Sequence, residues 1–396
     1  MNEMEPFRTP EAGGYIYVRE PEALEKLIQR IRNVDRVALD TEADSLHHYF
    51  EKVCLVQLSL GDEHFLLDPF AELDLTDFLE TLAEKSLIVH GGDFDLRMMR
   101  AWKGFRPRRE VFDTMIAAQL LGFEQIGLAA LIGNFFAITI EKEAQKSDWS
   151  RRPLSAKQLY YAANDTRFLN HLAERLHAEM LQRGRVDWHR ESCRAMVLAT
   201  ERDRLRDPEA IWRIKGAGRL TRRQLAYLRE LWHWRDLHAR RVNRPPFKIF
   251  GNQQILDLLH WAESHPNTPL DQGPKLPRNM VGVWLRTLEE TLARAAGLTP
   301  AEWPEHSRHV RADPPPIDCQ EQIDALRREC AGIAKELAIA PSTLAPRSAL
   351  EAIVQKRLRS FDDIVNSGDL LPWQAELVRP AVEKTLLAQE RQPGPA

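Results

Sequence analysis

The amino-acid sequence predicts an α/β domain with a mixed β-sheet, followed by two small all-helical regions. Short runs of apolar and β-branched residues dominate the first quarter of the chain, and helical patterns alternate with short breaks from there to about residue 200. After Asp207-Pro208 the apolar spacing is helical throughout. A chain of 396 residues is long for one domain, so we expect two or three.

Short segments rich in strand-forming residues predict the sheet. One is the run 37–42, and another pair, 53–60 and 64–67, flanks the turn residues 61–63 as in a hairpin. A further strand, 87–90, leads into two glycines and a helix. Strands interleaved with helices indicate a sheet covered by helices.

Composition shifts predict the domain boundaries. We expect the α/β domain at 1–207, a first helical domain at 208–297, a proline-rich linker at 298–317, and a second helical domain with a disordered tail at 318–396. Within the first helical domain, Thr221-x-x-Gln224 is a capping box, which predicts a helix from there to about Arg241.

Composition narrows the class of protein. No run approaches the roughly 20 apolar residues of a membrane helix, and the polar start MNEMEPFRTPEAGG lacks the apolar core of a secretory signal. Four scattered cysteines without a C-x-x-C pair argue against a disulfide framework or a structural zinc site. We therefore expect a reduced, cytoplasmic protein without a membrane partner.

Charge is unevenly distributed along the chain. Residues 1–150 carry 16 Lys and Arg against 27 Asp and Glu, whereas residues 201–250 carry 14 against 6. This pattern suits a metal–carboxylate site joined to a phosphate-binding surface. Two solvated faces explain it equally well.

Two carboxylates, Asp40 and Glu42, end the predicted strand 37–42. Alternate residues of a strand point to the same face, so these side chains lie next to each other. Like charges repel, and a shared divalent cation relieves the repulsion. Taken alone, however, the pair is better explained as a solvated strand end.

A third carboxylate, Asp95, follows strand 87–90 and the pair Gly91-Gly92. It falls in the first turn of a helix, where unpaired N–H groups favour a carboxylate for structural reasons alone. Asp93 is a rival candidate that suits the helix N-cap equally. We expect the ring of Phe94 to turn inward and anchor the turn.

A fourth carboxylate, Asp165, lies on a helix that begins with the capping box Ser155-x-x-Gln158. Tyr161 lies four residues before Asp165 and shares its face of the helix, which a surface Tyr–Asp pair also explains. Asp113 is more simply explained as a helix cap than as a ligand.

Together these motifs resemble the DEDD exonuclease superfamily, in the subgroup with a tyrosine in its third motif. Asp40-x-Glu42 matches the first motif, Asp95 after H-G-G the second, and Tyr161-x-x-x-Asp165 the third. Many relatives have Asn where Gly91 stands, so any substrate contact made by that Asn is absent here.

The segment before the third motif is the most specific part of the resemblance. Residues 147–155, followed by Gln158 and Tyr161-Ala162-Ala163, are similar to the ribonuclease D and Werner-type exonuclease branch. We expect Asp148 and Trp149 to order this loop before the catalytic helix.

The resemblance implies a fold, a cofactor and a reaction. It implies an RNase H-like domain whose two divalent cations are held by Asp40, Glu42, Asp95 and Asp165, with Tyr161 orienting the attacking water. Oxygen ligands suit Mg²⁺ or Mn²⁺ better than zinc. The expected product is a nucleoside 5′-monophosphate, released stepwise from the 3′ end of RNA.

The helical regions resemble the helicase-and-RNase-D C-terminal (HRDC) domain. Residues 217–297 carry this resemblance through 228–239 and Pro245-Pro246, and 318–390 carry it more faintly. Such domains bind nucleic acid or pack on the nuclease. The candidate RNA contacts are Arg222, Arg223 and Arg229 in the first helical domain, and Arg151 and Arg152 before the catalytic helix, although solvated surface explains them as well.

The expected partners are single-stranded RNA 3′ ends, with tRNA precursors implied by the resemblance, and the sequence leaves any protein partner unknown. Two alternatives stay open. A DNA 3′→5′ exonuclease would use the same chemistry, because discrimination rests on a contact to the 2′-hydroxyl. A non-catalytic nucleic-acid-binding scaffold would need a decayed site, against which the complete set of carboxylates argues.

Overall fold

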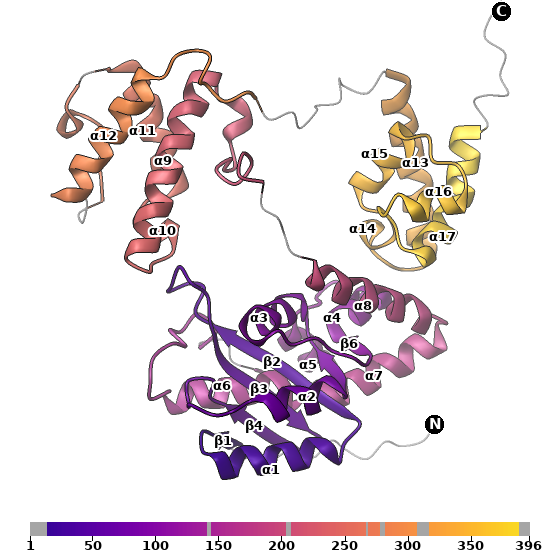
Figure 1. Cartoon of the computed structure of the whole chain (residues 1–396). Coiled ribbons are helices and arrows are strands. Elements are labelled where there is room, and N and C mark those ends of the chain that lie inside the picture. Colours follow the sequence, from indigo (N-terminus) through magenta and orange to yellow (C-terminus); the bar gives the residue numbers. More distant parts are fainter. Residues whose placement is uncertain are drawn as a thin grey trace, which may run out of the picture. The chain divides into compact units, whose positions relative to one another are not determined.

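The computed structural model describes residues 14–140, 144–202, 207–266, 268–277, 282–306 and 317–387. Residues 307–316 of the expected linker and the expected disordered tail therefore lie outside the described residues. The chain divides into two compact units, Met1–Ala43 with Val53–Arg202 and Pro314–Ala396, and Asp44–Lys52 with Asp203–Asp313. Figure 1 shows the elements of both units.

A six-stranded mixed sheet forms the centre of the first unit. Its strands are β1 (Ile16–Val18), β2 (Arg36–Ala43), β3 (Val53–Leu60), β4 (Glu63–Leu67), β5 (Ser86–Val89) and β6 (Val111–Asp113), in the order β1-β4-β3-β2-β5-β6. β2, β3 and β4 pair antiparallel, whereas β5 runs parallel to both β2 and β6. The predicted hairpin is confirmed, since Gly61 takes the left-handed conformation in its tight turn (φ +61°).

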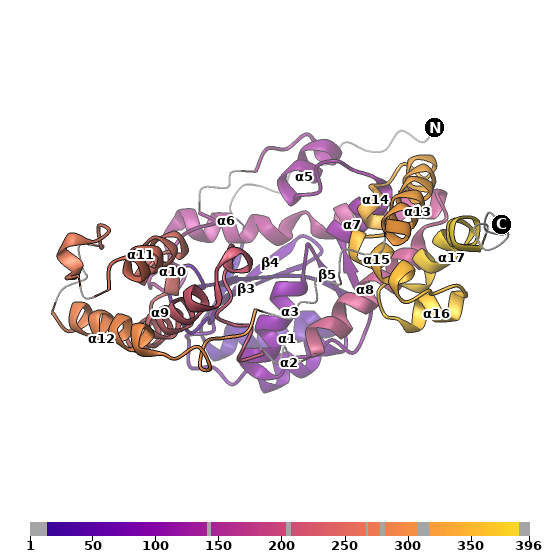
Figure 2. The ribbon, with the colours of Figure 1, turned by 90° about the horizontal axis from the view of Figure 1, so that it is seen from above.

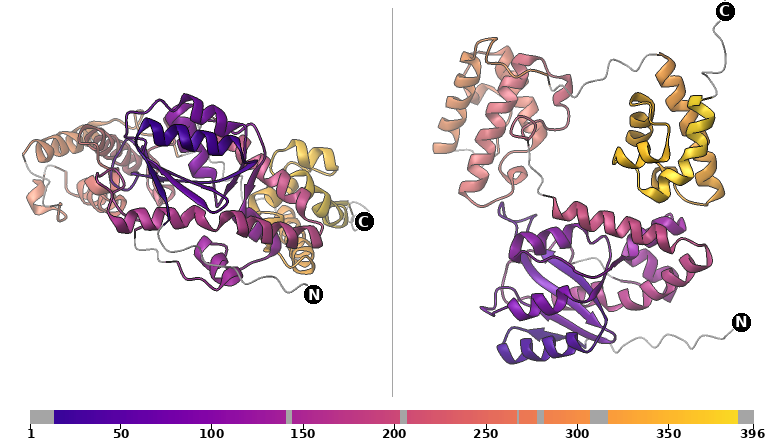
Figure 3. Two further views of the ribbon diagram at one scale, coloured as in Figure 1. Left: turned by 90° about the horizontal axis from the view of Figure 1, so that it is seen from below. Right: turned by 45° about the vertical axis from the view of Figure 1, so that its right-hand side comes forward.

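Helices cover both faces of this sheet (Figures 2 and 3). On one side lie α1 (Pro21–Arg32), α2 (Thr76–Ala83) and α3 (Asp93–Lys103), and on the other lie α6 (Ala156–Arg167) and α7 (Leu169–Gln182). Around them are α4 (Thr114–Leu121), α5 (Leu128–Phe136) and α8 (Val186–Glu201). The predicted α/β class with a mixed sheet is confirmed.

The alternation of side chains on β2 decides where its carboxylates point. Val37 and Leu39 are buried in the core beneath α1 and α2, whereas Ala38 is buried in a cluster with Leu169 of α7. Asp40 follows Ala38 by two residues, so it lies on the α6–α7 face of the sheet.

The C-terminal helices belong to the same compact unit as the sheet. They are α13 (Ile317–Glu336), α14 (Pro341–Leu344), α15 (Arg347–Gln355), α16 (Phe361–Asn366) and α17 (Pro372–Val382), followed by a last π-helical turn at Glu383–Leu387. The indole of Trp373 stacks on Trp188 of α8, with ring centroids 4.9 Å apart, and its Nε1 donates to Ser192 Oγ at 3.2 Å. At Gly122 (φ +82°), an added Cβ would lie 1.8 Å from the Ala338 carbonyl oxygen, so only glycine permits this approach.

The second unit is helical. It contains α9 (Arg222–Arg241), α10 (Pro246–Ile249), α11 (Asn252–Ser264) and α12 (Val283–Gly297), with short 3₁₀ turns at Ala217–Arg219 and Leu270–Gln272. The Thr221–Gln224 capping box is present and α9 ends at Arg241, as predicted. Trp234 is buried in the core of this unit beside Leu228.

The first half of the expected linker packs on α9. The Arg222 guanidinium donates to the carbonyl oxygens of Pro300, Trp303 and Pro304 at 3.1–3.4 Å, and Arg229 donates to that of Glu302 at 3.3 Å. A proline-rich segment has few backbone N–H groups, so its carbonyl oxygens need other hydrogen-bond donors, and here arginine side chains of α9 supply them. The boundaries expected from composition remain a prediction, because the compact units divide the chain differently.

Two further features bear on the class of protein. Among the described residues, no helix is long and apolar enough to cross a membrane. All four cysteines carry free thiols.

Candidate active site

The β2 carboxylates lie at the carboxyl end of the strand, on the face covered by α6 and α7. Burial raises the pKa of Asp40 well above its usual range, and the charges of Asp95 and Asp165 raise it further. Burial also raises the pKa of Glu42, with contributions from the same three carboxylates. The strand β2 and the helices α3 and α6 therefore bring the four predicted acids close enough to interact electrostatically.

The two candidates of the second motif lie in different surroundings. Asp95 is 6% exposed and accepts hydrogen bonds from Thr41 N of β2 at 3.1 Å and from Thr41 Oγ1 at 2.5 Å. Asp93 instead forms an exposed ion pair with Arg97 at 2.6 Å, and the helix N-cap is Gly92. The expectation for Phe94 was wrong, because its side chain is 38% exposed on the outer face of this first turn.

Asp113 holds the turn that carries Asp95. Its carboxylate caps α4 by accepting from Met115 N at 2.8 Å and Ile116 N at 3.2 Å, as the sequence predicted. The same carboxylate also accepts from Gly91 N at 3.0 Å and Gly92 N at 2.9 Å, which no sequence pattern indicated. One buried carboxylate thus fixes a helix start and the glycine turn together.

Glycine is favoured at both positions of that turn. Gly91 takes a left-handed conformation (φ +67°), and a Cβ at Gly92 would lie 2.5 Å from Val89 Cγ2. The turn is also held by His90, whose Nδ1 lies 2.9 Å from Thr114 Oγ1.

The third motif lies on α6, whose predicted capping box is present. The Ser155 hydroxyl accepts from Gln158 N at 3.3 Å, and Gln158 Oε1 accepts from Ser155 N at 3.0 Å. One turn further on, the Tyr161 hydroxyl hydrogen-bonds to the Asp165 carboxylate. Burial raises the pKa of Asp165 to about 7, and burial and the nearby carboxylates raise the pKa of Tyr161.

The loop before α6 supports Tyr161 from behind. Trp149 is 1% exposed, and its ring centroid lies 6.1 Å from that of Tyr161. Arg152 fastens this loop by a bidentate ion pair with Asp68, at 2.7 Å for both contacts, and by a bond to the Cys54 carbonyl at 2.6 Å.

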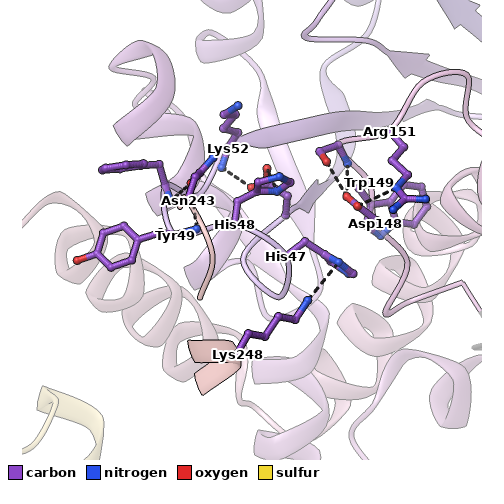
Figure 4. Close-up of polar contacts among 12 residues, drawn as sticks. His47, His48, Tyr49, Lys52, Asp148, Trp149, Arg151, Asn243 and Lys248 are labelled. Atoms are coloured by element: carbon purple, nitrogen blue, oxygen red, sulfur yellow. Dashed lines mark hydrogen bonds and ion pairs between the residues drawn. The ribbon is translucent and has the colours of Figure 1, made fainter. Parts of the chain in front are cut away.

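The two arginines of this loop differ as RNA-contact candidates. The guanidinium of Arg152 is occupied by intramolecular acceptors, including the Trp149 carbonyl at 2.8 Å, so we assign it a structural role. Arg151 pairs only loosely with Asp148 at 3.1 Å and keeps 82% of its side chain exposed (Figure 4). Asp148 orders the loop as expected, by accepting from Ser150 Oγ at 2.6 Å.

The arginines of α9 do not form one continuous stripe. Arg222 and Arg229 hold residues 300–304, as described above, and Arg235 is 5% exposed, with a bond to the Phe250 carbonyl at 3.0 Å. Arg223 is partly exposed on the same helix. Of the three α9 arginines expected to contact RNA, only Arg223 therefore remains a candidate without an assigned structural role.

The loop that follows β2 has contacts that sequence patterns did not indicate. The compact unit containing α9 includes this loop, Asp44–Lys52. The Tyr49 hydroxyl donates to Asp236 at 2.6 Å and accepts from Arg240 at 2.7 Å. Asn243 accepts from the Tyr49 amide at 3.2 Å (Figure 4). Exposed aromatic residues in a loop carry no periodic signal, so only the folded structure reveals this contact.

The carboxylates suit a hard divalent cation by chemistry, although they do not yet enclose one. Among the described residues, no three His, Cys, Asp or Glu side chains are arranged closely enough to hold one ion as they stand. Burial and neighbouring charges instead favour the protonated forms of Asp40 and Asp95 in the absence of a cation. A cation would take the place of those protons and relieve the mutual repulsion.

Comparisons with known proteins identify the family of this chain. The family model described as 3′-5′ exonuclease matches residues 15–181, and the HRDC domain model matches residues 224–269. The chain is similar to ribonuclease D of Acidiphilium cryptum, with 32% identity over 91% of this chain and 90% of that protein. It is also similar to ribonuclease D of Granulibacter bethesdensis, with 30% identity over 85% of each chain.

Solved structures show the same fold. The crystal structure of a protein from Bifidobacterium adolescentis matches with a TM-score of 0.79 and 23% identity, over 96% of this chain and 98% of that one. Ribonuclease D of Escherichia coli matches with a TM-score of 0.70 and 23% identity, over 96% of this chain and all of that one (100%). Taken together, the sequence relatives and the two domain matches show that the chain belongs to the ribonuclease D family of 3′-5′ exoribonucleases.

Proposed function

We propose that this protein removes nucleoside 5′-monophosphates stepwise from the 3′ ends of RNA, using two divalent cations held by Asp40, Glu42, Asp95 and Asp165. The observation that carries the proposal is the clustering of four carboxylates whose ionised forms destabilise one another. Natural folds retain such a cost at functional sites.

The cations, Mg²⁺ or Mn²⁺, would supply activation of the attacking water and stabilisation of the leaving 3′ oxygen. Asp40 and Glu42 are fixed by the strand, and Asp95 is fixed by its bonds to Thr41. These bonds hold the Asp95 carboxylate in position before substrate arrives, which reduces the reorganisation needed during the reaction.

Tyr161 acts as a hydrogen-bonding group rather than as a base. Because its pKa is raised, the hydroxyl keeps its proton at neutral pH. The hydroxyl donates a hydrogen bond to the Asp165 carboxylate. Its oxygen lone pairs are therefore left to accept a hydrogen bond from the attacking water. Trp149 packs behind the phenol ring and limits its motion.

The substrate class follows the family. Ribonuclease D of Escherichia coli is described as an exoribonuclease involved in structured RNA processing. By analogy we propose that this protein trims structured RNA precursors, including those of tRNA, with Arg151 and Arg223 contacting the phosphate backbone.

A time course on labelled single strands tests this proposal. RNA and DNA of one sequence, labelled at either end, are incubated with Mn²⁺ or with EDTA. We expect 5′-labelled RNA to shorten in single-nucleotide steps, 3′-labelled RNA to release labelled mononucleotide at once, and neither to change with EDTA. Faster shortening of DNA would favour the DNA exonuclease, and metal-independent binding without shortening would favour the scaffold.

A further inference from the structure

A basic hollow lies at the opposite end of the parallel strands from the carboxylates. It has a volume of about 520 Å³ and is bounded by the first residues of β2 and β5, by β6 with the loop before it, and by α7 and α8. We call it the basic pocket. Its size falls within the roughly 300–1,000 Å³ range of small-ligand sites.

Arginines surround the basic pocket. They are Arg36, Arg108, Arg109, Arg190 and Arg194, whereas Glu110 is the single acidic residue among those that line it. These guanidinium groups repel one another, so together they attract anions. The planar guanidinium group can donate two parallel hydrogen bonds to phosphate oxygens in particular.

Two of these arginines are available to a ligand. Arg108 is bound to Glu84 at 2.8 Å, and Arg190 is bound to Asp187 at 2.6 Å. Arg36 and Arg194 are exposed and belong to no ion pair among the described residues. An incoming phosphate group would therefore find these two guanidinium groups without first displacing an acidic partner.

The floor of the basic pocket is apolar and partly aromatic. The half-buried ring of Phe112 has two imidazole neighbours, with its centroid 4.3 Å from that of His189 and 6.3 Å from that of His177. His189 is already fixed, since its Nε2 lies 3.0 Å from the Asp113 carbonyl oxygen. Phe112 and the exposed His177 thus offer a surface on which a planar heterocycle can pack.

We propose that the basic pocket binds a nucleoside monophosphate, with the phosphate on Arg36 and Arg194 and the base against Phe112. The combination of a basic rim and an aromatic floor fits a ligand with one anionic end and one planar apolar end. A concave site of this size encloses a single nucleotide, whereas a polynucleotide backbone requires an extended basic track.

The basic pocket is separate from the carboxylate site. Both lie on the same face of β2, but Arg36 precedes Asp40 by four residues, which spans roughly 13 Å along a strand. Between them, Ala38 is buried against Leu169 and Ala173 of α7. A nucleotide in the basic pocket therefore does not touch the proposed metal ligands.

Isothermal titration of the full chain with AMP tests the proposal. EDTA is present throughout, so that AMP cannot bind through cations at the carboxylates. We expect one AMP per chain, and at least ~10-fold weaker binding by the Arg36→Gln/Arg194→Gln variant, because charged hydrogen bonds to phosphate are lost. The control Arg30→Gln/Arg32→Gln removes two exposed arginines of α1 and should change the dissociation constant by less than about twofold.

Two smaller probes separate the parts of the ligand. We expect ribose 5-phosphate and inorganic phosphate to bind more weakly than AMP, because they lack the base that packs on Phe112. Equal affinity for phosphate and AMP would overturn the assignment of a nucleotide. So would no AMP binding, equal AMP binding by both double variants, or binding by a 3′-phosphorylated RNA oligonucleotide where AMP alone fails to bind.

Discussion

The two ends of the parallel strands β2, β5 and β6 differ in charge and in burial. At their carboxyl ends lie the acids of the first two motifs and Asp113, which are buried or partly buried and confined by hydrogen bonds. At their amino ends lies the basic pocket, whose arginines are exposed. The same strands thus carry two different sites. Like charges at the carboxyl ends destabilise the fold, whereas water solvates the charges at the amino ends.

The difference indicates how each end is used. Buried like charges are tolerated only where a ligand of opposite charge offsets them, so the acidic end is expected to depend on cations. Exposed arginines need no such partner, so the basic end does not depend on a bound anion for folding. Variants at the acidic end should therefore change both activity and stability, whereas variants at the basic end should change neither by much.

The largest effect is expected at the acidic end. Asp40→Asn and Asp165→Asn should each reduce RNA cleavage at least roughly 10³-fold, because the remaining carboxylates cannot hold both cations. Both variants should unfold at the same or a higher temperature than the unchanged protein in EDTA, since a buried charge is removed.

Asp93→Asn is the matched control for these variants, because Asp93 lies two residues from Asp95 but pairs with Arg97. Initial rates on 5′-labelled RNA give the comparison. If Asp40→Asn cleaved RNA as fast as Asp93→Asn, Asp40 would not be part of the active site.

Tyr161→Phe should lower the cleavage rate roughly 10²-fold while leaving cation binding unchanged, because it removes the hydroxyl that orients water but no carboxylate. Single-turnover rates at saturating Mn²⁺ measure the loss. A variant whose rate recovers fully at higher Mn²⁺ would show that Tyr161 acts on metal affinity instead.

Asp113→Ala should lower activity roughly 10- to 100-fold and destabilise the fold by about 3 kcal/mol. The variant leaves four backbone N–H groups without their acceptor, in the turn before Asp95 and at the start of α4. Urea unfolding measures the stability loss. Unchanged activity in the folded variant would mean that the glycine turn keeps its shape without Asp113.

Cations should stabilise the protein more at pH 8 than at pH 6. The pKa values of Asp95 and Asp165 are raised to about 6 and about 7, so their ionised forms oppose folding above those values in the absence of cations. As pH falls through 7 and 6, protonation removes that repulsion, and Mn²⁺ must compete with protons. The rise in melting temperature on adding Mn²⁺ should therefore shrink as pH falls, and an equal rise at both pH values would contradict the assignment.

The smallest effect on catalysis is expected at the basic end. Arg36→Gln/Arg194→Gln should cleave RNA within about twofold of the unchanged protein, because exposed arginines distant from the carboxylates contribute little to the reaction. Initial rates with a short RNA, too small to reach both sites, provide the test. A large loss would place the two arginines on the path of the substrate.

Local signals predicted much of this molecule correctly. The hairpin around Gly61, the capping boxes at Ser155 and Thr221, and the end of α9 were all predicted, because each depends on residues close together in sequence. The four acids were selected because together they match the motifs of a known family, whereas periodicity alone left each of them with a structural explanation.

Contacts between distant segments could not be predicted in the same way. The different surroundings of Asp95 and Asp93 depend on Thr41, and the role of Arg152 depends on Asp68, 84 residues away in sequence. Phe94 was expected to turn inward on apolar character alone, although its position in the first turn of α3 leaves it exposed. The basic pocket unites segments from β2 to α8, so no single motif indicates it.

Titration of the full chain with Mn²⁺ at pH 8, followed by calorimetry, tests the central claim most directly. The account predicts that the unchanged protein binds two Mn²⁺ ions with release of protons, and that Asp40→Asn loses at least one of them together with its activity. Two Mn²⁺ ions bound equally well by Asp40→Asn, or cleavage of RNA by the unchanged protein in EDTA, would contradict it.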